Sequence, residues 1–421
     1  MDIPGLPARR AALNLLDAVL RRGETLDQAA GAALARVRGD ADRALARAIA
    51  GEVLRWRADL DALIDSATKQ PLPDDAKPRA VLEMMLAQVL RLETPPHAAI
   101  ATGLELLTGG PRRLAHGVFS TLMKREVSLP EVPTLPERTA ERWGERSAAI
   151  AAGLAVPPPL DLALRDAGET AAWAERLGGE TLVPGHLRLQ RGDQVSSLEG
   201  FGEGAWWVQD LAASLPARLL GAPGEGKDEG KGRRALDLCA APGGKTMQLA
   251  AMGWDVTALD NAGRRIERLR ENLERTSLEA EVVRADALKW EPEGGFDAIL
   301  LDAPCTATGT CRRHPDVLHR IGARQIEEMA AIQEAMLARA AGWLNPGGVL
   351  VYAVCSLEPE EGEAQASKLT QSGVLKPLPI RQDELPEGLA PTADGTLRTD
   401  PGMLAQAGGL DGFFIARWQK G

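Results

Sequence analysis

The sequence predicts a multidomain protein with an all-α N-terminal domain, a small α+β connecting subdomain and a C-terminal α/β domain built on a parallel, doubly wound sheet. Apolar residues recur at helical spacing through residues 6–127. A proline-rich stretch at 129–136 interrupts this pattern, and from residue 235 short apolar runs alternate with helical segments. Strands that alternate with helices are typical of a parallel sheet covered on both faces. We therefore expect domains at 1–128, 129–204 and 205–421.

The composition is that of an ordinary globular chain. Of 421 residues, 44% are hydrophobic and 26% are charged, which excludes a disordered or collagen-like protein. The net charge is −10, and residues 1–130 carry 18 basic and 16 acidic side chains, whereas the rest carries 31 and 43. Any site for a polyanion must therefore be a local patch. No apolar run reaches the roughly 18 residues of a membrane span, so we expect a cytoplasmic protein that does not bind membranes.

The first two domains contain few strand signals. Residues 82–86 are too apolar for an exposed helix and are expected at the centre of the helical domain. In the connecting subdomain, a helix is expected at 170–177 and a strand at 187–190. The charged, glycine-rich segment 221–234 is typical of a mobile surface loop.

In the α/β domain, polar or reactive residues follow the predicted strands. Strands are expected at 235–238, 255–259, 281–284, 296–301, 349–354 and, as an antiparallel edge, 412–418. Helices are expected from 245, at 264–275 and at 321–343, the last of them closed by a turn at 345–348. Ligands of parallel sheets bind at the carboxyl ends of the strands. The residues at or just after these ends are Cys239, Asp260, Asp286, Asp302, Cys305 and Cys355.

The turn after the first of these strands favours a nucleotide-like ligand. It reads Cys239-Ala240-Ala241-Pro242-Gly243-Gly244-Lys245, and its glycines allow a close approach of ligand to backbone at a helix N-terminus. A triphosphate-binding loop would need glycine at 239, and the dinucleotide pattern GxGxxG is absent. Asp260 suits a ribose diol and Asp286 a base, which favours S-adenosylmethionine. The alternative is an ordinary α/β turn with aspartate caps.

Two cysteines and one aspartate suit methyl transfer to a pyrimidine. Asp302 precedes Cys305 by three residues, and Cys355 ends another strand, so adjacent strand ends could bring both thiols to one pocket. Addition of a thiolate to carbon 6 turns the ring into an enamine whose carbon 5 can attack a methyl group. An acid near ring nitrogen 3 helps this addition. A base must then take the proton from carbon 5.

Other interpretations of these residues stay open. A metal site could be formed by Cys305, Cys311, His314 and His319, although paired ligand spacing is missing. The cysteines could be buried hydrophobes, or one could serve a Cys–His hydrolase, for which no motif is present. The run Arg312-Arg313-His314 could be a solvated charge cluster or could hold RNA phosphates.

Over nearly its whole length the chain resembles the Sun-type RNA cytosine carbon-5 methyltransferases, in the branch of bacterial small-subunit ribosomal RNA methyltransferases B. The likeness rests on residues 237–246, 302–305, 312–316, 352–356 and 411–414. The N-terminal helices are similar to a NusB-like RNA-binding domain at 43–50, 53–55 and 95–98. Residue 354 is Val where the family usually has Thr, and Gly362 in the acidic run 360–363 stands where Asn is common.

The resemblance implies a Rossmann-like, S-adenosylmethionine-dependent methyltransferase domain that forms 5-methylcytosine in small-subunit ribosomal RNA. It implies that Cys355 is the nucleophile, that Cys305 assists release of the methylated base, and that Asp302 contacts the cytosine with Lys245 nearby. The cofactor would be lined by 239–245, Asp260, Asp286 and Asp302. We expect no metal and a monomer. A non-catalytic RNA-binding assembly factor and a DNA cytosine methyltransferase, which uses the Pro-Cys thiol, are the alternatives.

Overall fold

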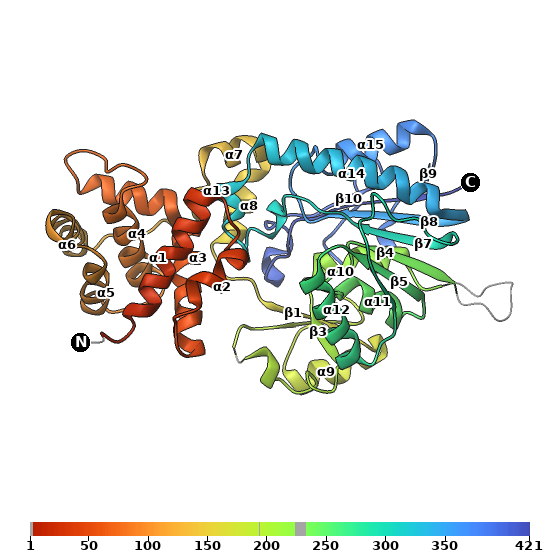
Figure 1. Ribbon diagram of the computed structural model, residues 1–421, viewed down its shortest axis with the longest axis horizontal. Helices are drawn as coiled ribbons and strands as arrows, with labels where there is room; N and C mark the ends of the chain where they lie inside the picture. Colours follow the sequence, from red (N-terminus) through yellow and green to blue (C-terminus); the bar gives the residue numbers. More distant parts are fainter. Residues whose placement is uncertain (1–2, 193, 224–232) are drawn as a thin grey trace. The chain divides into compact units, whose positions relative to one another are not determined.

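The fold consists of two compact units (Figure 1). A computed structural model describes residues 3–192, 194–223 and 233–421. The first unit is formed by Met1–Val156 with Cys311–Ile321, and the second by Pro157–Thr310 with Gly322–Gly421. Most of the predicted surface loop at 221–234 lies outside the described residues.

In its described residues the first unit is built from helices. Local signals set their ends: the Thr25 hydroxyl and the Gln28 side chain cap α2 reciprocally, and Gly23 ends α1 in the left-handed conformation. The α-helices of this unit are α1 (Leu6–Arg22), α2 (Leu26–Leu34), α3 (Asp40–Ser66), α4 (Lys77–Leu90), α5 (Pro96–Gly103), α6 (Gly109–Lys124), α7 (Glu137–Trp143), α8 (Ser147–Leu154) and α13 (Val317–Arg320).

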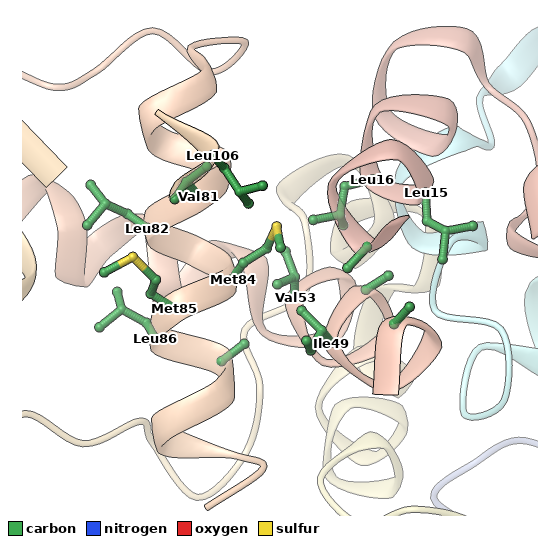
Figure 2. Packing of buried hydrophobic residues seen from close by; sticks show 14 of the residues in the cluster. Leu15, Leu16, Ile49, Val53, Val81, Leu82, Met84, Met85, Leu86 and Leu106 are labelled. Atoms are coloured by element: carbon green, nitrogen blue, oxygen red, sulfur yellow. The ribbon is translucent and has the colours of Figure 1, made fainter. Parts of the chain in front are cut away.

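Helix α4 lies at the centre of this unit, as its apolar sequence predicts. It packs against α1, α3, α5 and α6. Leu82, Met84, Met85 and Leu86 are all buried, and Figure 2 shows Met84 extending toward Val53 of α3. Because apolar side chains surround α4, burial of their surface is the main force that holds the helices together.

Residues 311–321 pack on the N-terminal helices. The Arg55 guanidinium donates to the carbonyl oxygen of Arg312 at 2.8 Å, and the Thr139 hydroxyl donates to that of Leu318 at 3.1 Å. The Nε2 atom of His319 lies 2.6 Å from the carbonyl oxygen of Leu54. The structure thus groups this segment, together with residues 129–156, with the first unit, whereas the sequence pattern assigned them to other domains.

The second unit begins with a small antiparallel sheet. Its strand order is β2-β1-β3, formed by β1 (Leu160–Leu164), β2 (His186–Leu189) and β3 (Trp206–Val208). Helix α9 (Thr170–Leu177) has the predicted bounds. The buried Asp161 carboxylate accepts two hydrogen bonds of 2.7 Å from Arg188 and so joins β1 to β2.

The main sheet has the order β10-β11-β8-β7-β4-β5-β6. Its strands are β4 (Arg234–Leu238), β5 (Asp255–Asp260), β6 (Glu281–Arg284), β7 (Phe296–Asp302), β8 (Leu344–Val354), β10 (Leu397–Arg398) and β11 (Phe414–Gln419), and β9 (Lys376–Pro377) also pairs with β11. Strands β4 to β8 are parallel, and β11 is antiparallel to β8, as predicted. The prediction of an edge strand at 412–418 is wrong, because β9 and β10 pair with the outer side of β11.

Helices cover both faces of the main sheet (Figure 1). Leu236 packs with the helices α14 (Ala323–Trp343) and α15 (Glu363–Ser372), whereas its neighbour Ala235 packs on the opposite side with α10 (Leu211–Leu220) and α11 (Gly244–Ala251). Helix α12 (Gly263–Thr276) packs beside α11. The long helix starts two residues later than predicted, and the predicted turn at 345–348 lies within β8, where the register with β7 is irregular.

Across the part of the chain that the structure describes, no helix combines the length and apolar character needed to span a membrane.

Candidate active site

The predicted site residues gather at the carboxyl ends of neighbouring strands. Asp302 is the last residue of β7, and Cys355 follows the last residue of β8. Cys239 follows β4, and Asp260 ends β5. Because β8, β7, β4 and β5 are consecutive in the sheet, residues far apart in the sequence meet along one edge.

The two predicted catalytic thiols are in contact. The Sγ atoms of Cys305 and Cys355 lie 3.5 Å apart, and both side chains are partly exposed. The Cys355 sulfur, together with burial and the Glu361 carboxylate, raises the pKa of Cys305 well above its usual value. Cys305 therefore holds its proton strongly.

Lys245 and Asp302 form an ion pair beside these thiols. The Lys245 ammonium donates to the Asp302 carboxylate at 2.7 Å and lies 5.4 Å from the centroid of the Phe413 ring. Burial lowers the pKa of Lys245, but the charge of Asp302 and a smaller effect of Cys355 outweigh burial and raise it. The ammonium is therefore a permanent donor that fixes the carboxylate at the end of β7.

The predicted cofactor turn is shaped by its glycine and by α12. Gly243 caps the N-terminus of α11 with a φ of 107°, and a Cβ atom there would lie 2.4 Å from the Leu269 side chain. The Arg265 guanidinium donates to the carbonyl oxygen of Ala241, and the Asn272 amide donates to that of Pro242 at 2.9 Å. These contacts hold the turn against α12, and the start of α11 offers backbone N–H groups to a ligand.

The aspartates near this turn differ in their environment. Asp260 is 3% exposed and accepts hydrogen bonds from the backbone N–H groups of Ala241 at 3.1 Å and Ala262 at 2.9 Å. It therefore supports the turn, and its remaining acceptor capacity is what a ribose could use. The Asp286 side chain is 43% exposed and lies 3.7 Å from the Lys289 ammonium. Burial, with a smaller contribution from Asp302, raises the pKa of Cys239 to about 12.

Residues 312–314 lie in the first unit, and only some of them are exposed to solvent. Arg312 is 2% exposed, whereas Arg313 and His314 are partly exposed, so in this conformation the guanidinium of Arg312 is not open to an RNA phosphate. The His314 ring nitrogen lies 3.9 Å from the Asp27 carboxylate. Within the described ranges, no three His, Cys, Asp or Glu side chains are grouped to hold a metal ion.

One buried residue of the site was not singled out from the sequence. The Glu361 carboxylate is completely buried and binds Thr306 and Ser356, the residues that directly follow the two cysteines. The sequence shows the acidic run at 360–363, but a run of glutamates that are all exposed to solvent would have the same sequence. Only the folded chain shows that Glu361 points inward while Glu360 is exposed.

Comparisons with known proteins show which family the chain resembles along most of its length. A family model described as 16S rRNA methyltransferase RsmB/F matches residues 227–419, and the NusB family model matches residues 6–109. The ribosomal RNA small subunit methyltransferase B of Xanthomonas campestris pv. campestris is 34% identical over 394 residues, which cover 87% of this chain and 88% of that protein. Its counterpart in Erwinia tasmaniensis is 33% identical and covers 98% of both chains. The crystal structure of PH0851 shares the fold, with a TM-score of 0.72, 23% identity and 100% coverage of both chains.

Proposed function

Since this chain belongs to the family of 16S rRNA methyltransferases RsmB/F, we propose that it methylates carbon 5 of a cytosine in small-subunit ribosomal RNA through a covalent cysteine–cytosine intermediate. It is an S-adenosylmethionine-dependent rRNA methyltransferase with an N-terminal NusB domain. The target base, the methylated atom and the residue roles belong to the proposal. The observation that carries it is the pair of thiols 3.5 Å apart beside the Lys245–Asp302 ion pair.

The two thiols have different roles, with Cys355 as the nucleophile and Cys305 as the base. The Cys355 thiolate adds to carbon 6 of the cytosine, which makes carbon 5 electron-rich enough to take a methyl group. Cys305, which is partly exposed, gives its proton to solvent and as a thiolate removes the proton from carbon 5. The electron pair of that C–H bond restores the ring double bond, the bond from Cys355 to carbon 6 breaks, and Cys355 leaves as a thiolate. Burial, Cys355 and Glu361 raise the pKa of Cys305, so its thiolate, once formed, is a strong base, which suits this role.

Lys245 and Asp302 orient and polarise the base. Asp302 lies at the end of the strand that leads to Cys305, so a carboxylate oxygen can accept a hydrogen bond from the exocyclic amine of the cytosine. The Lys245 ammonium, 2.7 Å from that carboxylate, supplies positive charge where electron density builds up in the ring during thiolate addition. The ion pair thereby favours the covalent adduct over the free base.

The turn at 239–245 fits the methyl donor. S-adenosylmethionine supplies an electrophilic methyl group when it is bound. We assign its binding to residues 239–245 with Asp260, Asp286 and Asp302, because the left-handed Gly243 lets a ligand approach the start of α11 and Asp286 offers an exposed carboxylate. The NusB domain, with Arg313 and His314, is the proposed contact with the RNA backbone.

Methyl transfer to defined RNA tests the proposal. The full-length protein is incubated with unmodified small-subunit rRNA, free or in assembly particles, and with S-adenosylmethionine labelled in its methyl group. We expect label in a single 5-methylcytosine, mapped by digestion and mass spectrometry. Label on another base or ring position, or transfer to duplex DNA instead, contradicts the proposed substrate. RNA binding without any transfer would favour a non-catalytic assembly factor.

A further inference from the structure

The carboxylate of Glu361 joins the two segments that carry the thiols. It accepts a hydrogen bond from the backbone N–H of Thr306 at 2.9 Å, a second from the Thr306 hydroxyl, and a third from the Ser356 hydroxyl at 2.8 Å. Thr306 follows Cys305 and Ser356 follows Cys355 in the chain. One side chain therefore links the residues next to both sulfur atoms.

Further hydrogen bonds hold both the side chain and the backbone of Glu361. Glu361 has no exposed surface, and the Gln333 amide of α14 donates to it at 2.9 Å. Its backbone carbonyl oxygen accepts a hydrogen bond of 2.5 Å from the Tyr352 hydroxyl of β8. Burial raises the pKa of Glu361, and the hydrogen bonds from Thr306 and Ser356 oppose that shift. Burying a carboxylate is costly, and the hydrogen bonds from Thr306, Ser356 and Gln333 offset that cost.

Further hydrogen bonds join the same two segments. The Gly309 N–H donates to the carbonyl oxygen of Cys355 at 3.0 Å, and the N–H of Leu357 donates to the Thr308 hydroxyl at 2.9 Å. The Arg398 guanidinium donates to the carbonyl oxygen of Ser356. These bonds hold the backbone of Cys355 and Ser356, whereas the Glu361 carboxylate connects Ser356 to Thr306, the residue after Cys305.

From this arrangement, and building on the proposed function, we propose that Glu361 is a positioning residue that holds the Cys305 and Cys355 thiols at the separation required for the nucleophile and the base to act on one cytosine. Its negative charge also acts on Cys305, whose pKa is raised by Cys355, by burial and by Glu361. Glu361 touches neither base nor cofactor in this role. It works through Thr306 and Ser356.

The effect of Glu361 on the separation of the two thiols is tested without RNA or cofactor, in glutathione redox buffers. The two thiols and oxidised glutathione exchange to give a protein disulfide and two molecules of reduced glutathione, so the equilibrium measures the effective concentration of one thiol toward the other. We expect Glu361→Ala to lower this value about tenfold, since loss of the carboxylate frees both segments, and Glu361→Gln to lower it less because the amide oxygen still accepts hydrogen bonds. The matched control is Glu360→Ala, an exposed neighbour with the same change.

The effect of the Glu361 charge on the pKa of Cys305 is tested by alkylation of each cysteine as a function of pH. Glu361→Gln removes the negative charge but keeps an acceptor, so the midpoint for Cys305 should move to lower pH, while Glu360→Gln leaves it unchanged. A role in packing alone would alter melting temperature without moving this midpoint. If Glu361→Ala does not fold, Thr306→Val and Ser356→Ala remove the hydroxyl donors with the carboxylate in place, and both should lower the effective concentration.

Measurements of kcat with RNA distinguish the positioning role of Glu361 from the proposed cytosine methylation. With RNA, Glu361→Ala should lower kcat by about a hundredfold with KM for RNA unchanged. Unchanged thiol equilibrium and unchanged kcat, relative to Glu360→Ala, overturn the positioning role. If the thiol equilibrium responds but the wild-type protein labels another base, the proposed function is wrong and the positioning of the thiols stands.

Discussion

The Sγ atoms of Cys305 and Cys355 lie 3.5 Å apart although the residues are 50 positions apart in the chain. Their strands β7 and β8 are parallel neighbours, with Asp302 opposite Ala353. Each cysteine follows the carboxyl end of its strand, and the pairing continues past β7, where Ala303 N–H donates to the carbonyl oxygen of Ala353 at 3.0 Å. The parallel register therefore brings the two sulfur atoms into contact.

The two cysteines should respond in opposite ways to replacement. Cys355→Ala removes the nucleophile and should abolish both methyl transfer and covalent capture of RNA. Cys305→Ala keeps the nucleophile but lacks the base, so a denaturation-resistant protein–RNA adduct should accumulate on gels. Cys311→Ala, a cysteine of the other unit, is the control. An adduct in Cys355→Ala would reverse the assignment.

Replacement of Lys245 should slow the reaction without unfolding the protein. Lys245→Met leaves the Asp302 carboxylate without the ammonium that lies 2.7 Å away. We expect kcat to fall by about a hundredfold or more, as for loss of a preorganised charged donor. Steady-state kinetics and circular dichroism measure the two effects. Lys368→Met removes an exposed ion pair with Glu334 on the same unit and should have normal kinetics; equal rates for both variants would contradict the assigned role.

Acid should loosen the segment 311–321. Burial lowers the pKa of His319 from 6.5 to about 4, so the folded state binds its proton less readily than the unfolded state. The stability that His319 contributes is therefore complete above pH 6.5 and is lost as the pH falls toward 4, by about 1.4 kcal/mol per pH unit. Hydrogen exchange at residues 311–321 between pH 7 and pH 4, corrected for intrinsic rates, measures this loss.

A non-titrating variant provides the comparison. His319→Gln can still donate to the carbonyl oxygen of Leu54, so its segment should exchange with little dependence on pH in this range. His314→Gln, on the same segment but partly exposed, should keep the wild-type pH dependence. The same slope in all three proteins would show that another group titrates.

Arg79 should be a major determinant of stability in the helical unit. Its side chain is 2% exposed, and its guanidinium donates to Asp61 and Asp65 at 2.6 Å each. Arg79→Met removes the cation of Asp65 and the nearer of two cations of Asp61, which should cost about 2–4 kcal/mol of unfolding free energy, as both carboxylates are partly solvated. Arg47→Met, also facing an aspartate but 53% exposed, should change stability little. Urea denaturation compares the two, and equal midpoints would refute the expectation.

Arg313 should contribute to RNA affinity but not to sequence preference. Arg313→Ala should weaken binding of all RNA sequences alike and lower the slope of log affinity against log salt by about 0.7–1 if one phosphate contact is lost. Filter binding at several salt concentrations measures this slope. Arg381→Ala, exposed on the second unit, is the control. An unchanged slope for Arg313→Ala means that this side chain contacts no phosphate.

Local patterns in the sequence located part of the secondary structure, including the strands β4 to β8 of the main sheet. The helix Thr170–Leu177 and the strand Glu281–Arg284 have the predicted bounds, because helical and alternating periodicities are properties of neighbouring residues. The order of strands and helices also implied the parallel sheet. The placement of polar or reactive residues after strands therefore predicted that Asp302, Cys355, Cys239 and Asp260 would lie along one edge of the sheet.

Contacts between distant parts of the chain were decided by the tertiary structure alone. The burial of Arg312 on the helical unit, the pairing of β9 and β10 with β11, and the reach of Glu361 to Thr306 and Ser356 depend on strand register and packing, which no local pattern records. From the sequence, an exposed glutamate in an acidic run cannot be distinguished from a buried one. Its role is set by which donors the fold brings within hydrogen-bonding distance, and that is a property of the whole packed chain.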